Sequence, residues 1–252
     1  MRGTMKIQAP TLTPVLIAAC VAVAFQTSLG EDRSALEPLF IAGRGHTLLQ
    51  ELAAGEVWRL VTPIFIHFGP VHLLFNMMWV WDLGREIERR NSPWFLAGFV
   101  ALVGISANIA QYLASGPAFG GMSGVVYGLL AYIWVRNRLD PNAGYVLHQY
   151  DVLTCMGWYV LCWTGALGPI ANWAHTAGLI AGLAWGYLET MVIGARGGLP
   201  PRPQYVRPEA PEGSGQASQQ TSVLRRLAPG SLLITLAVLA GLVALLLLLR
   251  PN

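Results

Sequence analysis

Residues 175–186 read His-Thr-Ala-Gly-Leu-Ile-Ala-Gly-Leu-Ala-Trp-Gly, and this stretch decides how the chain folds. From Gly178 onward a glycine recurs at every fourth position, so one face of a helix would carry no side chains. A second stretch, residues 123–136, has Gly124 and Gly128 at the same interval. Small residues at this spacing let two membrane helices approach closely, and packing alone would explain the pattern. We predict that the two stretches form neighbouring helices.

The composition is that of a membrane protein. Apolar residues make up 54% of the chain and charged residues 12%, which is about half the charged fraction of a soluble domain. Several apolar stretches approach the length that crosses a hydrocarbon layer of ~30 Å. There are seven of them: residues 11–29, 71–88, 94–114, 123–136, 151–168, 173–193 and 231–249. The predicted fold class is therefore all-α, a polytopic membrane helix bundle.

The basic residues predict the orientation of this bundle. Arginines or lysines lie before the first stretch and after the second, fourth and sixth, whereas the connections after the third and fifth carry no charge. By the positive-inside rule the N-terminus is cytoplasmic. The first stretch could be mistaken for a signal peptide, but no clear small-residue cleavage site precedes Glu31, so we expect a retained helix.

The chain divides into three parts. Residues 1–193 are expected to form a six-helix core, in which the first outside loop, 30–70, mixes acids, glycines and an apolar run and dips into the membrane interface. Residues 194–230 are rich in Pro, Gly, Ser and Gln and predict a disordered cytoplasmic linker. Residues 231–252 predict an additional C-terminal transmembrane helix.

The charge argues against nucleic-acid binding, and the cysteines argue against a disulfide or a metal site. The net charge is only +3, and no basic patch with interleaved aromatics indicates nucleic-acid binding. The three cysteines, Cys20, Cys155 and Cys162, all fall in apolar stretches and favour packing over a disulfide or a metal site. We expect no metal site at these cysteines, and the partner that the composition implies is the lipid bilayer.

Three polar residues on different stretches are expected at one depth. Ser123 lies thirteen residues before the charged end of its helix, which is ~20 Å. His72 and His175 lie thirteen and fourteen residues from the charged ends of theirs. In a core of ~30 Å all three side chains would lie ~10 Å below the outer surface.

This placement predicts acyl-transfer chemistry. A serine hydroxyl needs a base, and histidine serves because its pKa lies near neutrality. Because no carboxylate lies at this level, we expect a Ser123–His175 dyad, with Tyr127 packing on the imidazole. The oxyanion donors would be the Ser123 backbone and the side chains of His72 and Asn76. Alone, each residue has a structural explanation, such as a helix cap or a packing histidine; together they favour a functional site.

At these residues the chain resembles the rhomboid intramembrane serine proteases. The motifs, in order, are Gly55-Glu-Val-Trp58-Arg59, His67-Phe-Gly-Pro-Val-His72-Leu-Leu-Phe-Asn76, Gly120-Gly121-Met122-Ser123-Gly124-Val-Val-Tyr127 and Ala174-His175-Thr-Ala-Gly178. The resemblance implies a six-helix core with the Ser123 nucleophile, the His175 base and the oxyanion residues named above. Tyr127, Gly121, Gly124 and Gly178 then support the site.

The resemblance also implies substrates and a location. Substrates would be single-span membrane proteins, cut in or near their transmembrane segment, and no metal or organic cofactor is used. The stretch 231–249 is a departure, because it makes a six-plus-one arrangement, whereas the simplest bacterial members have six helices and mitochondrial forms place the extra one first. We expect a multi-pass protein of the bacterial inner membrane.

Two other functions stay open at this point. A catalytically inactive rhomboid-like factor would bind membrane proteins without cutting them, although such relatives typically lack the serine or the histidine. A small transporter or channel could line a polar path with His72, Asn76 and Ser123. The sequence shows neither the paired intramembrane carboxylates nor the broken-helix repeat expected of a transporter.

Overall fold

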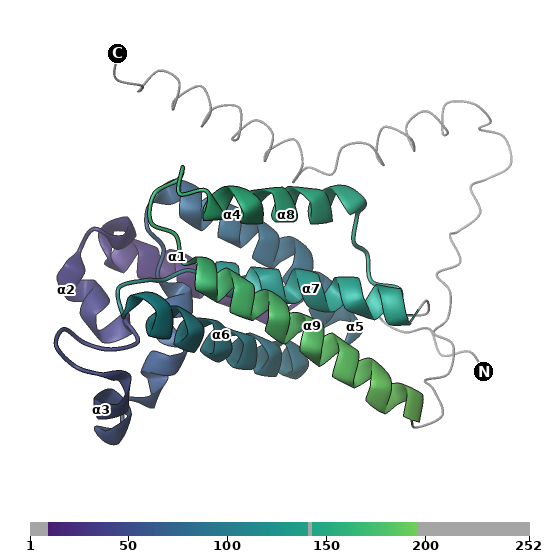
Figure 1. The fold of residues 1–252 in the computed structure, drawn as a ribbon, viewed down its shortest axis with the longest axis horizontal. Helices are drawn as coiled ribbons and strands as arrows, with labels where there is room; N and C mark the ends of the chain where they lie inside the picture. Colours follow the sequence, from purple (N-terminus) through teal and green to yellow (C-terminus); the bar gives the residue numbers. More distant parts are fainter. Residues whose placement is uncertain (1–9, 141–142, 196–252) are drawn as a thin grey trace, which may run out of the picture.

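A computed structural model describes residues 10–140 and 143–195. The predicted helix 231–249 and the linker from residue 196 to 230 lie outside the described residues. Every regular element within the described ranges is helical (Figure 1). The predicted all-α class is therefore confirmed for this part of the chain.

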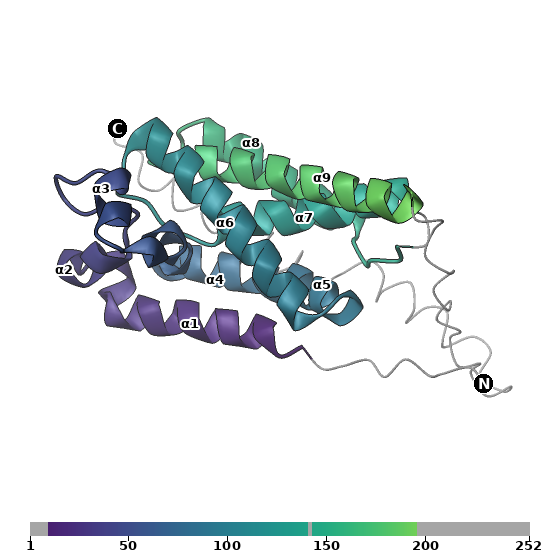
Figure 2. The ribbon, with the colours of Figure 1, turned by 90° about the horizontal axis from the view of Figure 1, so that it is seen from below.

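Helices cover the first six apolar stretches. They are α1 (Leu12–Gln26), a continuous run of α4 (Pro70–Trp79), the π-helical η5 (Val80–Gly84) and α5 (Arg85–Arg90), then α6 (Pro93–Ser115), α7 (Ser123–Leu139), α8 (Gln149–Trp163) and α9 (Asn172–Ala195). Two views at right angles show them side by side in one bundle (Figures 1 and 2). The hydropathy pattern thus locates these helices, although the number of membrane crossings stays a prediction.

Helix ends differ from the predicted ones where the backbone turns. The stretch 151–168 forms a helix only to Trp163, because Gly165, directly after the cap residue Thr164, takes a positive φ of 75° that ends the helix. In contrast, α9 extends to Ala195, two residues into the predicted linker. Among the described helices, α6 is the one that is long and apolar enough to cross a membrane by length and composition alone.

The first loop is folded rather than a free connection. It contains five short helical turns: α2 (Arg33–Leu36), η2 (Glu37–Leu39), α3 (Leu48–Ala53), η3 (Val57–Leu60) and η4 (Thr62–Phe65). The buried Arg59 side chain joins η3 to η2, since its Nη1 donates to the carbonyls of Glu37 and Phe40 at 2.8 and 2.9 Å. Its Nε pairs with Glu56. Whether this loop enters the membrane interface stays a prediction.

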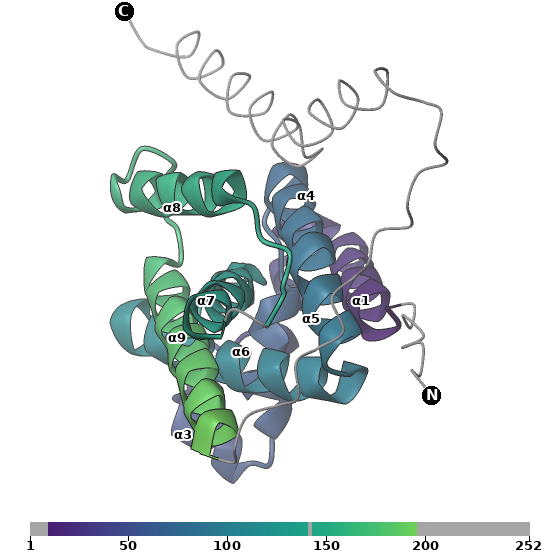
Figure 3. The same ribbon diagram turned by 90° about the vertical axis from the view of Figure 1, so that its right-hand side faces the viewer.

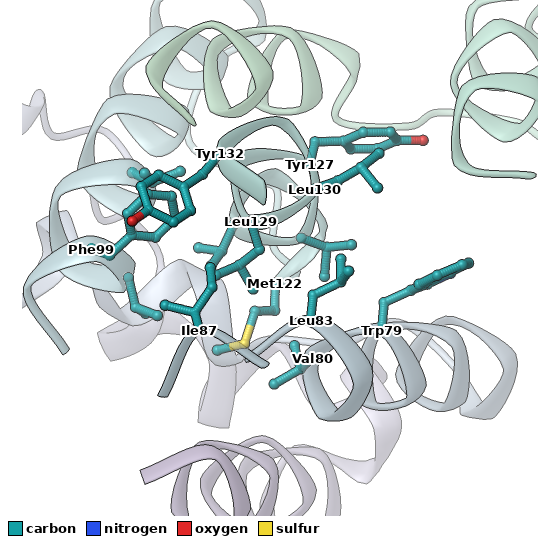
Figure 4. Close-up of a cluster of buried hydrophobic side chains, with 14 of the residues drawn as sticks. Trp79, Val80, Leu83, Ile87, Phe99, Met122, Tyr127, Leu129, Leu130 and Tyr132 are labelled. Carbon is teal, nitrogen blue, oxygen red and sulfur yellow. The ribbon is translucent and has the colours of Figure 1, made fainter. Parts of the chain in front are cut away.

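Helix α7 forms the centre of the bundle. Its side chains are buried on nearly every side, as expected for a helix that is apolar all round. Figure 4 shows Leu129 and Met122 pointing toward Leu83 and Ile87, while Tyr132 lies beside Phe99. The Tyr132 and Phe99 rings meet edge to face with centroids 5.2 Å apart. A serine at the start of this helix is therefore held by a tightly packed core.

Glycines set the distance between α7 and α9, which make the most extensive contact of any helix pair. A Cβ atom added to Gly178 would collide with the Gly124 carbonyl, and one added to Gly182 would collide with the Gly128 carbonyl. The two glycine-bearing stretches therefore pack backbone against backbone, as the spacing predicts.

A buried carboxylate joins α1 to the rest of the bundle. Glu88 on α5 accepts hydrogen bonds from the backbone N–H groups of Thr11, Leu12 and Thr13 at 2.6, 2.7 and 2.9 Å. It also accepts from the Thr13 hydroxyl at 2.7 Å. The first N–H groups of a helix have no partner within it, so Glu88 satisfies those of α1.

Candidate active site

The structure brings Ser123 and His175 together. Ser123 opens α7 and His175 lies in the first turn of α9, and the Ser123 Oγ is 2.8 Å from the His175 Nε2. This distance is within the range that proton transfer between the two side chains needs. The close α7–α9 contact at Gly178 and Gly124 lies directly beneath the pair and fixes their separation.

The backbone before Ser123 is shaped by a glycine that no other residue could replace without strain. Gly121 has φ 128°, and a Cβ atom there would lie 2.8 Å from the ring of His72 and 3.7 Å from the Ser123 Oγ. The His72 Nε2 and the Ser123 hydroxyl therefore border one small space. Ser123 also begins its helix, where the first backbone N–H groups have no intrahelical partner.

The His72 ring is oriented by its neighbours in the chain. Its Nδ1 accepts a hydrogen bond from the Phe68 N–H at 3.2 Å, so in the neutral ring the proton is on Nε2, which faces Gly121. The Phe68 ring stacks on it with centroids 6.5 Å apart, and the ring of the buried His67 lies at 5.1 Å, tilted by 53°. His72 is thus a hydrogen-bond donor aimed into the space beside Ser123.

Asn76 lies one helical turn below His72. Its Nδ2 donates to the His72 carbonyl at 2.9 Å, and its buried Oδ1 has no hydrogen-bond partner among the described residues. One amide N–H remains for another acceptor, because the amide carries two. The structure thus places Asn76 on the predicted face of α4, with its amide partly used by its own helix.

His175 is held by a ring rather than by a carboxylate. The Tyr127 ring lies against the imidazole with centroids 4.9 Å apart and an angle of 44° between the planes. The Tyr127 hydroxyl donates to the Cys155 carbonyl of α8 at 3.1 Å. The His175 Nδ1 is buried and has no hydrogen-bond partner within residues 10–140 and 143–195. Packing against Tyr127 and the contact with the Ser123 hydroxyl therefore orient the ring.

Three polar residues that the sequence reasoning did not use position the start of α9. The Gln111 Oε1 on α6 accepts from the Ala174 N–H at 3.1 Å. The hydroxyls of Tyr159 on α8 and Thr176 on α9 are 2.7 Å apart. Both contacts flank His175. Gln111 could have been noticed as a polar residue in an apolar stretch, whereas the Tyr159–Thr176 pair depends on how α8 docks.

The described part of the chain holds no group of three side chains suited to a metal ion. Cys20 on α1 and Cys155 and Cys162 on α8 are buried thiols that form no disulfide.

Comparison with known proteins identifies the family. A rhomboid domain matches residues 54–191, which is more than half of the chain. The rhomboid protease GlpG of Salmonella paratyphi A is 36% identical over 190 residues, covering 75% of this chain and 67% of that protein. The chain belongs to the rhomboid family. The proteins named rhomboid protease GlpG from Salmonella typhi and Salmonella newport match this rhomboid with the same identity and coverage.

Membership of the family indicates that the candidate site belongs to a membrane-embedded domain. Rhomboids are membrane-embedded, and the relatives above belong to an intramembrane serine protease family. Ser123, His175, His72, Asn76 and Tyr127 all lie within the matched domain. The resemblance read from the sequence motifs is therefore confirmed at the level of the family.

Proposed function

We propose that this rhomboid is a serine endopeptidase that cuts single-span membrane proteins in or near their transmembrane segment. The observation that carries the proposal is the 2.8 Å contact between the Ser123 Oγ and the His175 Nε2 in a chain of a protease family. A hydrogen bond between a hydroxyl and a histidine base is the arrangement that activates a serine nucleophile.

In the proposed reaction, the Ser123 Oγ attacks the carbonyl carbon of the scissile peptide while its proton passes to the His175 Nε2. The tetrahedral intermediate collapses when the C–N bond breaks, and the imidazolium gives its proton to the leaving amine. Water then adds to the acyl-enzyme with His175 again acting as the base, which releases the acid and restores Ser123. Tyr127 keeps the ring in place through both steps.

The oxyanion would be stabilised by three donors. These are the Ser123 backbone N–H, the His72 Nε2–H and the second amide N–H of Asn76. The first two border the space in front of the hydroxyl, where negative charge develops, and donors aimed at that position are worth ~3 kcal/mol each in serine hydrolases. Asn76 would complete the site from one turn below.

We also propose the topology expected from the sequence. The arginine-bearing ends of α5 and α7 would lie at the cytoplasmic side of a bacterial inner membrane, with the N-terminus cytoplasmic and Ser123 toward the outside. The GlpG relatives of Salmonella species support the bacterial inner membrane. Residues 1–193 would be the protease core and residues 231–252 an appended transmembrane helix.

Cleavage of a reporter tests the proposal. The full chain is reconstituted in liposomes with a single-span reporter, and fragments are followed by electrophoresis. The parent chain should cut the reporter, and Ser123→Ala and His175→Ala should each lower the rate by more than about 10³-fold. Ser106→Ala is the matched control, because that hydroxyl bonds to Leu102 on an exposed face of α6. Reporter retained uncut by the parent chain would instead support a binding factor, and cleavage by Ser123→Ala would refute the dyad.

A further inference from the structure

A groove lies at the end of the bundle opposite Ser123, between the last turns of α7 and the first turns of α8. Its volume is about 420 Å³, which is within the range of small-ligand sites. Its lining includes Trp134, Arg138, Leu147, Gln149, Val152 and Leu153. Arg138 is fifteen residues beyond Ser123, or ~22 Å along the helix, so the groove is separate from the candidate active site.

The charge in this groove is the Arg138 guanidinium, which has no counter-charge among the described residues. Arg138 is exposed, and no carboxylate within residues 10–140 and 143–195 forms an ion pair with it. Other arginines at this end are paired: Arg85 with Asp82, and Arg90 with Glu86. The Arg138 guanidinium lies instead over the Trp134 ring at 5.6 Å. That position fixes the guanidinium at the mouth of the groove and leaves its donors available to an anion.

The rest of the groove is apolar and exposed. Leu153 is 66% exposed and Trp134 41%, and Leu147 and Val152 continue the apolar lining toward the core. Helix α8 lies at the edge of the bundle and makes few contacts with its neighbours (Figure 3). In a membrane-embedded chain these side chains face hydrocarbon, so a ligand here would be in contact with both a cation and acyl chains.

We propose that this groove binds one anionic glycerophospholipid. The phosphate would be bound by Arg138 with the Gln149 amide as a second donor, and an acyl chain would lie along Leu153, Val152 and Trp134. In the topology proposed above, on which this inference rests, the arginine-rich end lies in the cytoplasmic leaflet, where basic pockets between transmembrane helices bind anionic headgroups. The proposal does not depend on Ser123 acting as a nucleophile.

Native mass spectrometry of the full chain in detergent tests this site. Phosphatidylglycerol and phosphatidylcholine are titrated separately, and the population carrying one lipid is measured. The parent chain should take up one phosphatidylglycerol in preference to phosphatidylcholine. Arg138→Gln should weaken that binding about fivefold, which corresponds to ~1 kcal/mol for one basic residue at an anionic surface. Leu153→Ser should weaken it as well.

Arg89→Gln is the matched control, because Arg89 is an exposed arginine of α5 at the same end and outside the groove. It should leave the affinity unchanged. Equal losses in Arg138→Gln and Arg89→Gln would overturn the proposal, since they would mean attraction to net charge alone. Equal uptake of both lipids by the parent chain would overturn it too. So would displacement of the lipid by soluble glycerol phosphate, because the apolar lining would then contribute nothing.

Discussion

Adding one methyl group to Gly178 should separate the side chains of Ser123 and His175. A Cβ atom at this position would lie 2.7 Å from the Gly124 carbonyl carbon, whereas ordinary contacts begin at 3.4 Å. To relieve the overlap with the carbonyl carbon alone, α7 and α9 must move apart by about 0.7 Å, because a close-packed core has no space to absorb it. The Gly124 carbonyl oxygen lies closer still and requires a larger movement. The Ser123–His175 contact of 2.8 Å would then exceed the reach of proton transfer.

The expected size of the effect follows from that displacement. A misplacement of ~1 Å costs about a hundredfold in rate, and overpacking of a core costs about 2 kcal/mol of stability. Gly178→Ala should therefore lower reporter cleavage about a hundredfold, together with a lower thermal midpoint for the purified protein.

Gly98→Ala in α6 provides the matched control, since a Cβ atom there meets nothing within 4 Å. This variant should keep full cleavage and be equally or slightly more stable, because alanine favours a helix over glycine. If Gly178→Ala retained the cleavage rate and the thermal midpoint of Gly98→Ala, the glycine contact could not be what sets the distance between Ser123 and His175.

Three further perturbations have expected outcomes. Tyr127→Phe keeps the ring on the imidazole and loses only the bond to Cys155, so it should cost ~1 kcal/mol of stability and little cleavage, whereas Tyr127→Ala should lose cleavage. Glu88→Gln should lower the unfolding free energy measured with denaturant by about 2 kcal/mol, because one oxygen no longer accepts from α1; an unchanged value would contradict this role. In the first loop, the Gly43 N–H bonded to Glu51 lowers the pKa of that carboxyl, so its stabilisation is complete above the unfolded value of about 4.3 and is lost as pH falls through the folded pKa. When thermal midpoints are measured over a series of pH values, the midpoint of Glu51→Gln should fall less on acidification than that of the parent chain.

Hydropathy and spacing predicted much of this fold. The six apolar stretches within the described residues coincide with helices, because each is long, apolar and bounded by charged or glycine-rich connections. The approach of Ser123 to His175 was also predictable, since equal distances from the charged helix ends set one depth and glycines allow contact. The end of α8 at Trp163 was not predictable, because the apolar stretch continues past this residue and hydropathy does not indicate the positive φ of Gly165.

Side chains that join different helices could not be predicted in the same way. Glu88 looks like one more charge at a helix end, and only the docking of α1 reveals that its carboxylate satisfies that helix's N–H groups. Gln111 is a polar residue within an apolar stretch, yet its partner Ala174 is a backbone group that no sequence pattern identifies. Such contacts depend on the relative positions of helices, which hydrophobic spacing sets only approximately.

Labelling by a fluorophosphonate probe tests the central claim most directly. The probe reacts only with an activated serine, so the detergent-purified parent chain should gain one adduct, located on Ser123 by peptide mass spectrometry. His175→Ala should abolish the adduct while leaving the thermal midpoint close to that of the parent, because the base would be lost and the glycine packing kept. Labelling of Ser123→Ala to the same extent as the parent chain would contradict the Ser123–His175 dyad.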